Sequence, residues 1–283
     1  MSAPQQHITP ALRQWIVAQA QAGHLPEDIV KSMVASGWAE DVALSALEGT
    51  LRERLTELRA ATPLAVPVPE PQLAEGANRI VAEGHSVDIV MTLRQPRVVV
   101  FGNLLTAAEC DALMDLARPR LARSETVVNA TGGSEVHAAR TSDGMFFTRG
   151  EAPLIECIEA RIAALLNWPV DHGEGLQILR YRPGAQYLPH HDYFDPAQPG
   201  TPAILKRGGQ RVATLIMYLA APEGGGATTF PDATLDVAPV RGSAVFFSYD
   251  RPHAVTRTLH GGAPVLAGEK WVATKWLREG VFV

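Results

Sequence analysis

The chain has 283 residues, of which 46% are hydrophobic and 19% charged, with a formal net charge of -5 and a pI of about 6.0. This composition is typical of a globular protein with room for one large domain and one small one. It provides no concentrated basic face of the kind that phosphate binding requires, so nucleic acid is not expected as a partner. No apolar run approaches the ~20 residues that span a bilayer, so no membrane partner is expected either.

The beginning of the chain and its cysteines bear on location. The first residues lack the basic start, the apolar core and the small-residue cleavage site of a secretory signal. Cys110 and Cys157 both lie in helix-like surroundings, which favours buried free thiols in a reducing compartment. We therefore expect a cytoplasmic protein.

Residues 1–60 predict a small bundle of three helices. Thr9 followed by Pro10 is typical of an N-cap and a first helical position, and apolar residues then recur at helical spacing. A second helix is expected from Pro26 to the break at Gly37-Trp38, and a third from 41 to 59.

The second and third of these helices carry a resemblance of their own. The stretch VKSMVASGWAEDVALSAL, residues 30–47, is similar to ubiquitin-associated modules. This resemblance implies a module that docks a protein partner or the substrate. A helical cap packed on the main domain is the alternative.

The pattern changes after the bundle. Residues 61–80 are rich in proline and predict an extended, semi-rigid linker. Residues 81–283 form the main domain, in which two helices, from Thr106 and from Ala152, precede many short strands separated by glycine and proline. We predict an α+β fold, in which a double-stranded β-helix (jelly roll) is backed by helices.

The strongest chemical signal is the stretch 176–194, LQILRYRPGAQYLPHHDYF. In an extended strand, residues two apart point to the same face, so His190 and Asp192 are expected to aim together while His191 points away. With His260 they form a two-His, one-carboxylate set, the ligand type of non-haem Fe(II) oxygenases. A zinc hydrolase also uses such ligands and is a weaker alternative.

A second group of residues suggests an anionic co-substrate. Lys270 lies in the middle of a predicted strand, where a buried ammonium needs an anionic partner such as a dicarboxylate. Tyr181 is a candidate to hydrogen-bond the same carboxylate. Thr274 and Trp276 alternate on one face of the Lys270 strand and are expected to line the same interior. Arg140 is a second candidate cation near the mouth.

These residues lie in segments that together resemble the catalytic domain of prolyl 4-hydroxylases, which are iron(II)- and 2-oxoglutarate-dependent dioxygenases. The matching segments, in order, are RTSDGMF (140–146), the stretch 176–194, GGQRVATLIMYLAAPEGGGATTFP (208–231), APVRGSAVFFS (238–248) and LHGGAPVLAGEKWVATKW (259–276). The resemblance implies that the iron ligands are His190, Asp192 and His260. It also implies that Lys270 and Tyr181 contact 2-oxoglutarate, and that Trp276 and Arg140 occupy pocket positions. We expect Thr274 and Trp276 to help bind the co-substrate, and Arg140 and Trp276 to contact the substrate.

The same resemblance implies a reaction. Oxidative decarboxylation of 2-oxoglutarate would be coupled to hydroxylation of a peptidyl proline, with Fe(II), O2 and ascorbate as cofactors. The N-terminal bundle differs from the peptide-binding domains of collagen-modifying relatives, so a protein or peptide with an accessible proline is favoured over collagen. The same chemistry on a free amino acid or small metabolite is one alternative. A non-catalytic scaffold acting through the N-terminal module is another, which the intact residue set disfavours.

Two further segments of the main domain allow more than one interpretation. Residues 195–209 are long and rich in proline and glycine, and predict either a mobile lid over the mouth or a plain crossover loop. The polar excursion 122–139 is a candidate for gripping a peptide. His253 follows Arg251-Pro252 and is expected in a turn, away from the metal.

Overall fold

The structure is a computed structural model that describes residues 6–73, 77–123, 126–127, 134–135 and 141–283. It divides into two compact units, Met1–Pro63 and Leu64–Val283, which we call the N-terminal unit and the C-terminal unit. Within the described part of the chain, no helix combines the length and the apolar character needed to cross a membrane.

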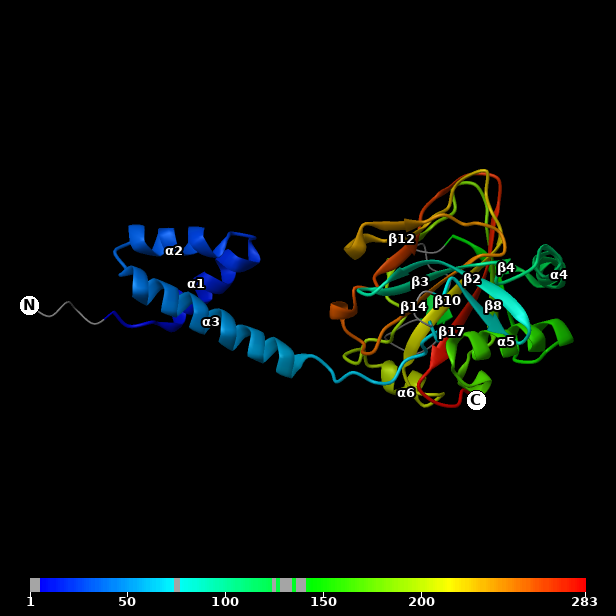
Figure 1. Ribbon diagram of the computed structural model, residues 1–283, viewed down its shortest axis with the longest axis horizontal. Coiled ribbons are helices and arrows are strands. Elements are labelled where there is room, and N and C mark those ends of the chain that lie inside the picture. Colours follow the sequence, from blue (N-terminus) through cyan, green and yellow to red (C-terminus); the bar gives the residue numbers. More distant parts are fainter. Residues whose placement is uncertain (1–5, 74–76, 124–125, 128–133, 136–140) are drawn as a thin grey trace, which may run out of the picture. The chain divides into compact units, whose positions relative to one another are not determined.

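The N-terminal unit is the predicted bundle of three helices (Figure 1). Its helices are α1 (Pro10–Gln21), α2 (Pro26–Ala35) and α3 (Glu40–Ala61). The Thr9 side chain accepts a hydrogen bond from the Leu12 backbone N–H, as expected for an N-cap residue before a proline. The apolar faces meet in a core that includes Ile16, Ile29 and Met33, against which Trp38 packs.

The proline-rich segment differs from the predicted linker. From Leu64 onward it belongs to the C-terminal unit rather than lying free between units. The Val66 N–H donates to the Asp250 carbonyl at 2.8 Å, and Glu70 forms an ion pair with Arg97. Pro69 is buried as well. Proline content predicted the extended conformation, but these contacts with distant residues cannot be read from local composition.

The C-terminal unit contains a large and a small antiparallel sheet. The large sheet has nine strands in the order β1 (Arg79–Ala82), β2 (His85–Leu93), β3 (Arg97–Gly102), β14 (Ala244–Ser248), β10 (Arg211–Ala220), β17 (Lys270–Arg278), β8 (Leu176–Tyr181), β7 (Asp143–Phe147) and β4 (Ala122–Arg123). The small sheet has the order β13 (Leu235–Val237), β12 (Thr228–Phe230), β15 (His260–Gly262) and β9 (Tyr187–His190). Two strand pairs complete the set, β11 (Gly224–Gly225) with β16 (Val265–Ala267), and β5 (Thr126–Val127) with β6 (Ser134–Glu135).

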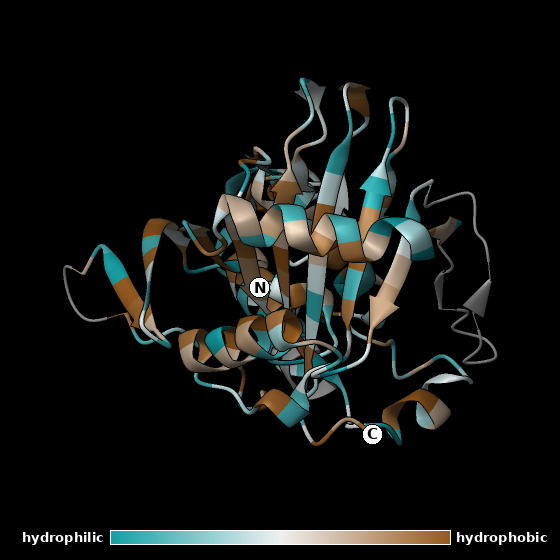
Figure 2. Cartoon of the chain, turned by 90° about the vertical axis from the view of Figure 1, so that its right-hand side faces the viewer, coloured by the Kyte–Doolittle hydropathy of each residue, from teal (hydrophilic) through white to brown (hydrophobic). Residues whose placement is uncertain are grey.

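Helices cover one face of the large sheet, as the predicted jelly roll requires. Helices α4 (Ala107–Ala117) and α5 (Pro153–Leu166) pack their apolar sides on that face, and Figure 2 shows helices of this unit lying across the strands. The remaining helices are short: α6 (Thr201–Leu205), η1 (Arg118–Arg120), η2 (Val170–His172), η3 (Pro231–Ala233) and η4 (Ala254–Thr256).

Strand β17 illustrates how alternation divides the unit into two layers. Trp271, Ala273 and Leu277 point into the helix-covered core, and Val272 points into a second core between the sheets. On the helix side, buried Lys275 forms an ion pair with Glu159 of α5. On the side that faces the small sheet, the same strand supplies residues of the pocket described below. The register of β17 therefore determines which of its side chains enter the helix-covered core and which enter the pocket.

Helix α4 begins with the predicted capping box. The Glu109 N–H donates to the Thr106 hydroxyl at 3.2 Å, and the Thr106 N–H donates to the Glu109 carboxylate at 2.8 Å. Arg161 of α5 binds the same carboxylate at 2.7 Å. Burial alone would raise the pKa of Glu109, but Arg161 and the Thr106 hydrogen bonds outweigh it and lower that pKa to about 2.

This capping box leads to a stability prediction. Thr106→Ala is expected to lower the free energy of unfolding of the C-terminal unit by about 1 kcal/mol, because a helical N–H loses its partner. Urea unfolding followed by circular dichroism measures the change. Thr106→Ser keeps the hydroxyl and is expected to remain near the original stability, and equal losses in both variants would contradict the capping role.

Residues 195–209 form hydrogen bonds within the segment and to the C-terminal residue of the chain. The Thr201 hydroxyl donates to the Asp195 carbonyl at 2.7 Å, and the Arg207 Nε–H donates to the Val283 carbonyl at 2.7 Å. Every residue of the segment is described, and none lines the pocket presented below. These contacts favour the crossover interpretation over the lid. The excursion 122–139 lies largely outside the described residues.

Candidate metal and co-substrate site

One pocket brings together most of the residues that the sequence pointed to. It encloses about 440 Å³, including its open mouth, and its walls come from both sheets. Seven predicted residues line it: His190, Asp192, His260, Lys270, Tyr181, Thr274 and Trp276. Arg140 lies outside the described residues.

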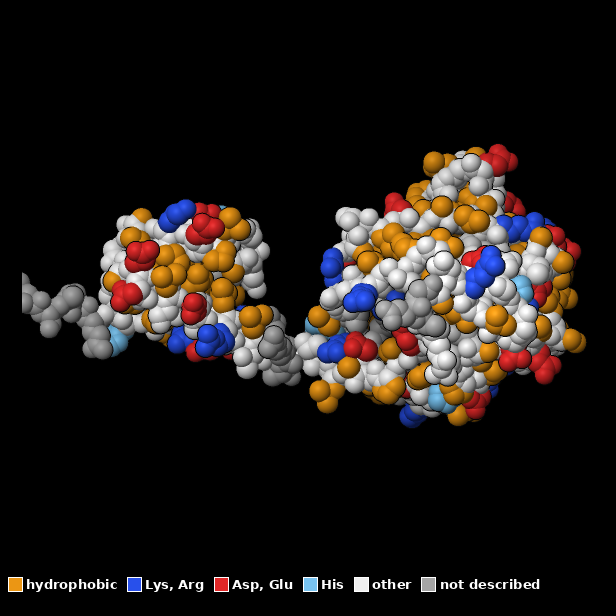
Figure 3. Space-filling view, viewed as in Figure 1, with side chains coloured by type: hydrophobic (Ala, Val, Ile, Leu, Met, Phe, Trp, Pro, Cys, Tyr) orange, Lys and Arg blue, Asp and Glu red, His pale blue; other side chains and the backbone are white. Residues whose placement is uncertain are grey.

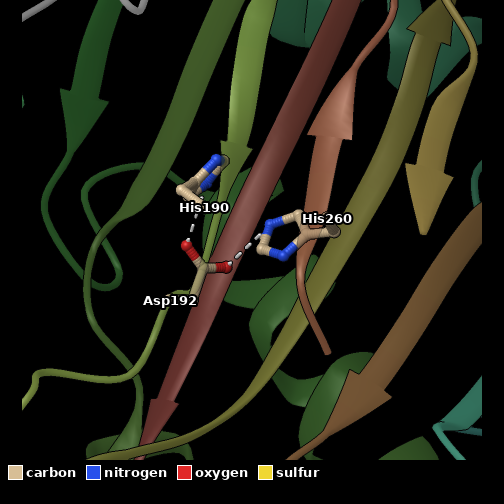
Figure 4. Close-up of side chains that lie close together, drawn as sticks. All are labelled: His190, Asp192 and His260. Carbon is tan, nitrogen blue, oxygen red and sulfur yellow. Dashed lines mark ion pairs between the residues drawn. The ribbon is translucent and has the colours of Figure 1, made fainter. Parts of the chain in front are cut away.

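Three of these side chains converge on one point (Figure 4). His190 Nε2 lies 3.5 Å from Asp192 Oδ1, and His260 Nε2 lies 3.4 Å from Asp192 Oδ2. Strands β9 and β15 pair so that His190 is opposite His260. The predicted strand alternation does not extend to Asp192, because β9 ends at His190 and Asp192 follows in a bend. The bend nevertheless turns its carboxylate toward both rings.

Both histidines have their tautomer set by the backbone. His190 Nδ1 lies 2.9 Å from the Leu188 carbonyl, and His260 Nδ1 lies 3.0 Å from the Thr258 carbonyl. A carbonyl only accepts, so each Nδ1 carries the hydrogen and each neutral ring leaves an Nε2 lone pair facing Asp192. Burial, followed by the neighbouring His260, lowers the pKa of His190 and so favours its neutral form.

The carboxylate is ionised in this setting. Burial alone would raise the pKa of Asp192, but the positive charge that His260 and His190 carry when protonated, and the hydrogen bonds that they then donate, outweigh burial and hold that pKa well below its usual range. When both rings are neutral, two nitrogen lone pairs and a carboxylate face one another within 4.8 Å. Such a set of electron-pair donors requires a cation between them, and two histidines with one carboxylate fit Fe(II).

Lys270 is a buried cation without a counter-ion. It is 4% exposed, and no ion pair among the described residues includes it. Its Nζ lies 5.5 Å from the centre of the Tyr181 ring and 5.6 Å from that of Tyr218. The buried Trp276 Nε1–H, in the same pocket, also has no hydrogen-bond partner. An unpaired ammonium and an unused N–H fit an anionic ligand such as 2-oxoglutarate.

Sequence reasoning missed a hydroxyl pair beside Lys270. Tyr218 of β10 donates to the Thr228 Oγ1 of β12 at 2.7 Å, and Thr228 lines the pocket. Because Thr228 accepts from Tyr218, its own hydrogen is free to donate into the pocket. Both residues lie in a segment that matched the family pattern, but nothing local in that segment distinguishes them from other strand residues.

Other neighbours of the three converging side chains were also missed. The Tyr187 ring stacks on the His190 ring with centroids 3.8 Å apart. Behind the pocket, the Arg211 guanidinium lies 4.0 Å from the centre of the Trp276 ring and binds buried Glu174 at 2.6 Å. These contacts fix the orientation of a metal-facing ring and of a pocket wall.

Two histidines lie away from the site, as expected. His191 does not line the pocket and packs against the Tyr193 ring, with centroids 4.7 Å apart. His253 is exposed, and its Nδ1 accepts a hydrogen bond from the Val255 N–H at the start of η4. The adjacent His191 therefore provides a matched control for His190.

Lys270 gives the site a pH dependence. Burial lowers its pKa to about 8 in the ligand-free protein, so the ammonium is present at neutral pH and is lost as the pH rises through that value. Only the ammonium attracts a carboxylate, so affinity for 2-oxoglutarate is expected to be constant below about pH 7 and to fall by up to about tenfold per unit well above pH 8.

Isothermal titration of the Mn(II)-loaded protein with 2-oxoglutarate, from pH 6.5 to 9.5, measures this dependence. Lys270→Arg serves as the control, because a guanidinium stays charged over the whole range and its profile is expected to be flatter. Equal affinity at both ends of the range in the unchanged protein would contradict the assignment.

Comparison with known proteins agrees with this geometry. Residues 176–278 match the model of the 2OG-Fe(II) oxygenase superfamily. The chain is 41% identical over 209 residues to probable prolyl 4-hydroxylase 3 of Arabidopsis thaliana, covering 66% of this chain and 71% of that protein. It is 44% identical over 202 residues to prolyl 4-hydroxylase 1 of the same plant, covering 65% and 69%.

A solved structure extends the likeness to the fold. The viral collagen prolyl hydroxylase vCPH of Paramecium Bursaria Chlorella virus-1, in its 2OG complex, is 31% identical with a TM-score of 0.50. That match covers 64% of this chain and 95% of the viral chain. Residues 176–278, which match the family model, contain the three converging side chains and the buried lysine. This chain belongs to the prolyl 4-hydroxylase family of 2OG-Fe(II) oxygenases.

Proposed function

We propose that this chain uses Fe(II), 2-oxoglutarate and O2 to hydroxylate proline within a polypeptide. The observation that carries the proposal is a single pocket that contains both a His-Asp-His cluster and a buried lysine with no counter-ion. The choice of peptidyl proline is supported by relatives that are named as prolyl 4-hydroxylases. Two of them are 41% and 44% identical to this chain over the aligned residues.

Within this proposal, different residues of the pocket bind the metal and the co-substrate. His190, Asp192 and His260 hold Fe(II), and they leave further coordination positions open as two-His, one-carboxylate sets do. Lys270 and the Thr228 hydroxyl bind the distal carboxylate of 2-oxoglutarate. Tyr181 lies directly opposite Lys270 in the strand register and contributes to the same end of the pocket.

The remaining pocket residues orient the substrate and shield the reacting groups from water. The bound metal and co-substrate supply an O2-dependent oxidation that hydroxylates a C–H bond and yields succinate and CO2. Ile216, Val272 and Leu179 give the pocket an apolar wall, which limits the access of water. The Tyr187 ring, stacked on His190, and Trp276 present aromatic surface on which a proline ring of the substrate can pack.

Turnover on peptides tests the proposal. Purified protein with Fe(II), ascorbate and 2-oxoglutarate is expected to form succinate faster when a proline-containing peptide is added, and mass spectrometry is expected to find one added oxygen atom on proline. A matched peptide with alanine in place of proline is the control. Equal stimulation by the two peptides, with no oxygen on proline, would contradict the substrate assignment. Omitting ascorbate from the same assay tests its use as a reductant.

Two alternatives predict other outcomes. If a free amino acid or small metabolite is the substrate, that compound supports turnover and proline peptides only compete with it. If the chain is a scaffold, an anaerobic titration with Fe(II) and 2-oxoglutarate gives no binding at all. The unpaired Lys270 in a pocket with three metal-facing side chains argues against the scaffold, since a buried cation without a ligand is costly.

We further propose that the N-terminal unit docks protein substrates or partners. Hydrophobic side chains gather on the face seen in Figure 3, with acidic side chains around them. Val34 and Leu44 are 42% and 46% exposed, so both side chains are accessible to a partner. Val34→Glu and Leu44→Glu are expected to raise the KM for a protein substrate and to leave the KM for a short peptide unchanged. A rise in KM for both the protein substrate and the short peptide would mean that the substitutions act on the catalytic site and not on docking.

A cytoplasmic location also remains part of the proposal. Cys110 and Cys157 are both free, which fits a reducing compartment, although Cys157 is exposed and not buried as the sequence suggested. Fractionation of cells that produce the protein tests this location, and recovery in an oxidising compartment would contradict it.

A further inference from the structure

Two hydroxyl groups outside the pocket form a chain that ends on Asp192. Thr214 of β10 donates its hydroxyl hydrogen to Asp192 Oδ2 at 2.7 Å. The Tyr249 hydroxyl, which follows β14, lies 3.0 Å from the same Thr214 oxygen. Thr214 is 0% and Tyr249 2% exposed, and neither lines the pocket. These residues therefore reach the site only through Asp192.

The direction of the hydrogen bonds in this chain is fixed by chemistry. An ionised carboxylate only accepts, so the single hydroxyl hydrogen of Thr214 is committed to Asp192. The oxygen of Thr214 can then only accept from Tyr249, whose hydroxyl must be the donor. The order is Tyr249 to Thr214 to Asp192, with every hydrogen assigned.

The hydrogen bond restrains the one ligand that no regular strand holds. His190 and His260 lie in paired strands and have Nδ1 bonded to backbone carbonyls, whereas Asp192 lies in a bend after β9. Thr214 holds Oδ2, so the carboxylate cannot turn freely about its Cβ–Cγ bond, and Oδ1 stays directed toward His190.

We propose that Thr214 and Tyr249 are positioning residues that set the metal affinity of the site by orienting the Asp192 carboxylate. Thr214 acts on Asp192 directly, and Tyr249 acts only through Thr214. The inference rests on the metal site of the proposed function and is independent of which substrate is hydroxylated.

Metal titration of the full chain tests the inference without any assay of turnover. Isothermal titration with Co(II), a redox-stable probe, is carried out on metal-free protein whose folding has been checked by circular dichroism. Thr214→Val is expected to weaken Co(II) binding about 10–100-fold, the usual cost of removing a partner of a metal ligand. Thr214→Ser keeps the hydroxyl and is expected to stay within about threefold of the unchanged protein.

Tyr249 supplies the decisive comparison. Tyr249→Phe is expected to weaken Co(II) binding about threefold to tenfold, because Thr214 loses the donor that orients it. The double variant Thr214→Val/Tyr249→Phe is expected to bind as Thr214→Val does, because Tyr249 acts only through Thr214. Tyr249→Phe keeps the buried ring, so it tests the proposal even where Thr214→Val does not fold.

A matched control separates positioning from general stability. Thr201 is 1% exposed and donates its hydroxyl to the Asp195 carbonyl, in a segment that does not line the pocket. Thr201→Val is expected to leave Co(II) affinity unchanged.

Three results would overturn the inference. The inference is wrong if Thr214→Val and Tyr249→Phe both bind Co(II) with unchanged affinity. It is also wrong if the fold-loss of Co(II) affinity in the double variant equals the product of the fold-losses in the two single variants. Failure of the unchanged protein to bind Co(II) would remove the metal site as well, whereas in the first two cases the metal site stands.

Discussion

Replacing His190 by alanine is expected to abolish succinate formation, with a loss of more than about a thousandfold. The metal loses one of three protein ligands, and metal catalysis provides several kcal/mol of transition-state stabilisation. Co(II) titration is expected to show weakened binding in parallel. Succinate formation with saturating 2-oxoglutarate and peptide measures the effect.

The neighbouring residue makes this result specific. His191→Ala removes the same kind of side chain one position along the chain, from a ring that does not line the pocket. It is expected to keep turnover and Co(II) affinity within about threefold of the original values. Full turnover in His190→Ala, or equal losses in the two variants, would show that the metal assignment is wrong.

Replacing Lys270 by methionine is expected to raise the Kd for 2-oxoglutarate by about 30-fold or more. A buried carboxylate left without its cation costs about 2–5 kcal/mol, and 2 kcal/mol corresponds to about 30-fold. Methionine fills a similar volume, so the pocket is expected to keep its shape. Titration of the Mn(II)-loaded protein measures the Kd, while Co(II) affinity is expected to remain unchanged.

Lys275 provides the control on the same strand. It lies on the opposite face of β17, paired with Glu159, and its removal alone would leave a buried carboxylate unpaired. The double variant Lys275→Met/Glu159→Gln therefore replaces both charges. It is expected to change the free energy of unfolding and to leave the Kd for 2-oxoglutarate unchanged. A rise in that Kd similar to the rise for Lys270→Met would mean that the effect comes from the strand rather than from the ammonium.

The sequence predicted the residues of the site better than the geometry that brings them together. Alternation along one strand was sufficient to place Lys270, Thr274 and Trp276 on a common face, because the side-chain period of a strand depends on local conformation alone. His190 and Asp192 also converge as predicted. A bend after the strand, rather than alternation along it, directs the Asp192 carboxylate toward His190.

Contacts between distant segments could not be predicted in this way. Thr214, Tyr249, Tyr218 and Thr228 acquire their importance from the register of strands that are far apart in sequence, and no local pattern encodes that register. The proline-rich segment was predicted only as an extended, semi-rigid linker for the same reason, since the Arg97 that pairs with its Glu70 lies beyond the next strands. Arg140 lies outside the described residues, so its predicted role stays a prediction.

The separation of the metal-facing residues along the chain has a thermodynamic consequence. His260 meets His190 and Asp192 only because β15 pairs with β9, so an unfolded chain cannot present the three groups together. Metal therefore binds the native state in preference and shifts the folding equilibrium by mass action, by about 2.7 kcal/mol when its free concentration is 100 times Kd. The midpoint of thermal unfolding should rise with Mn(II) concentration, and metal supply to the cell should control how much folded protein persists.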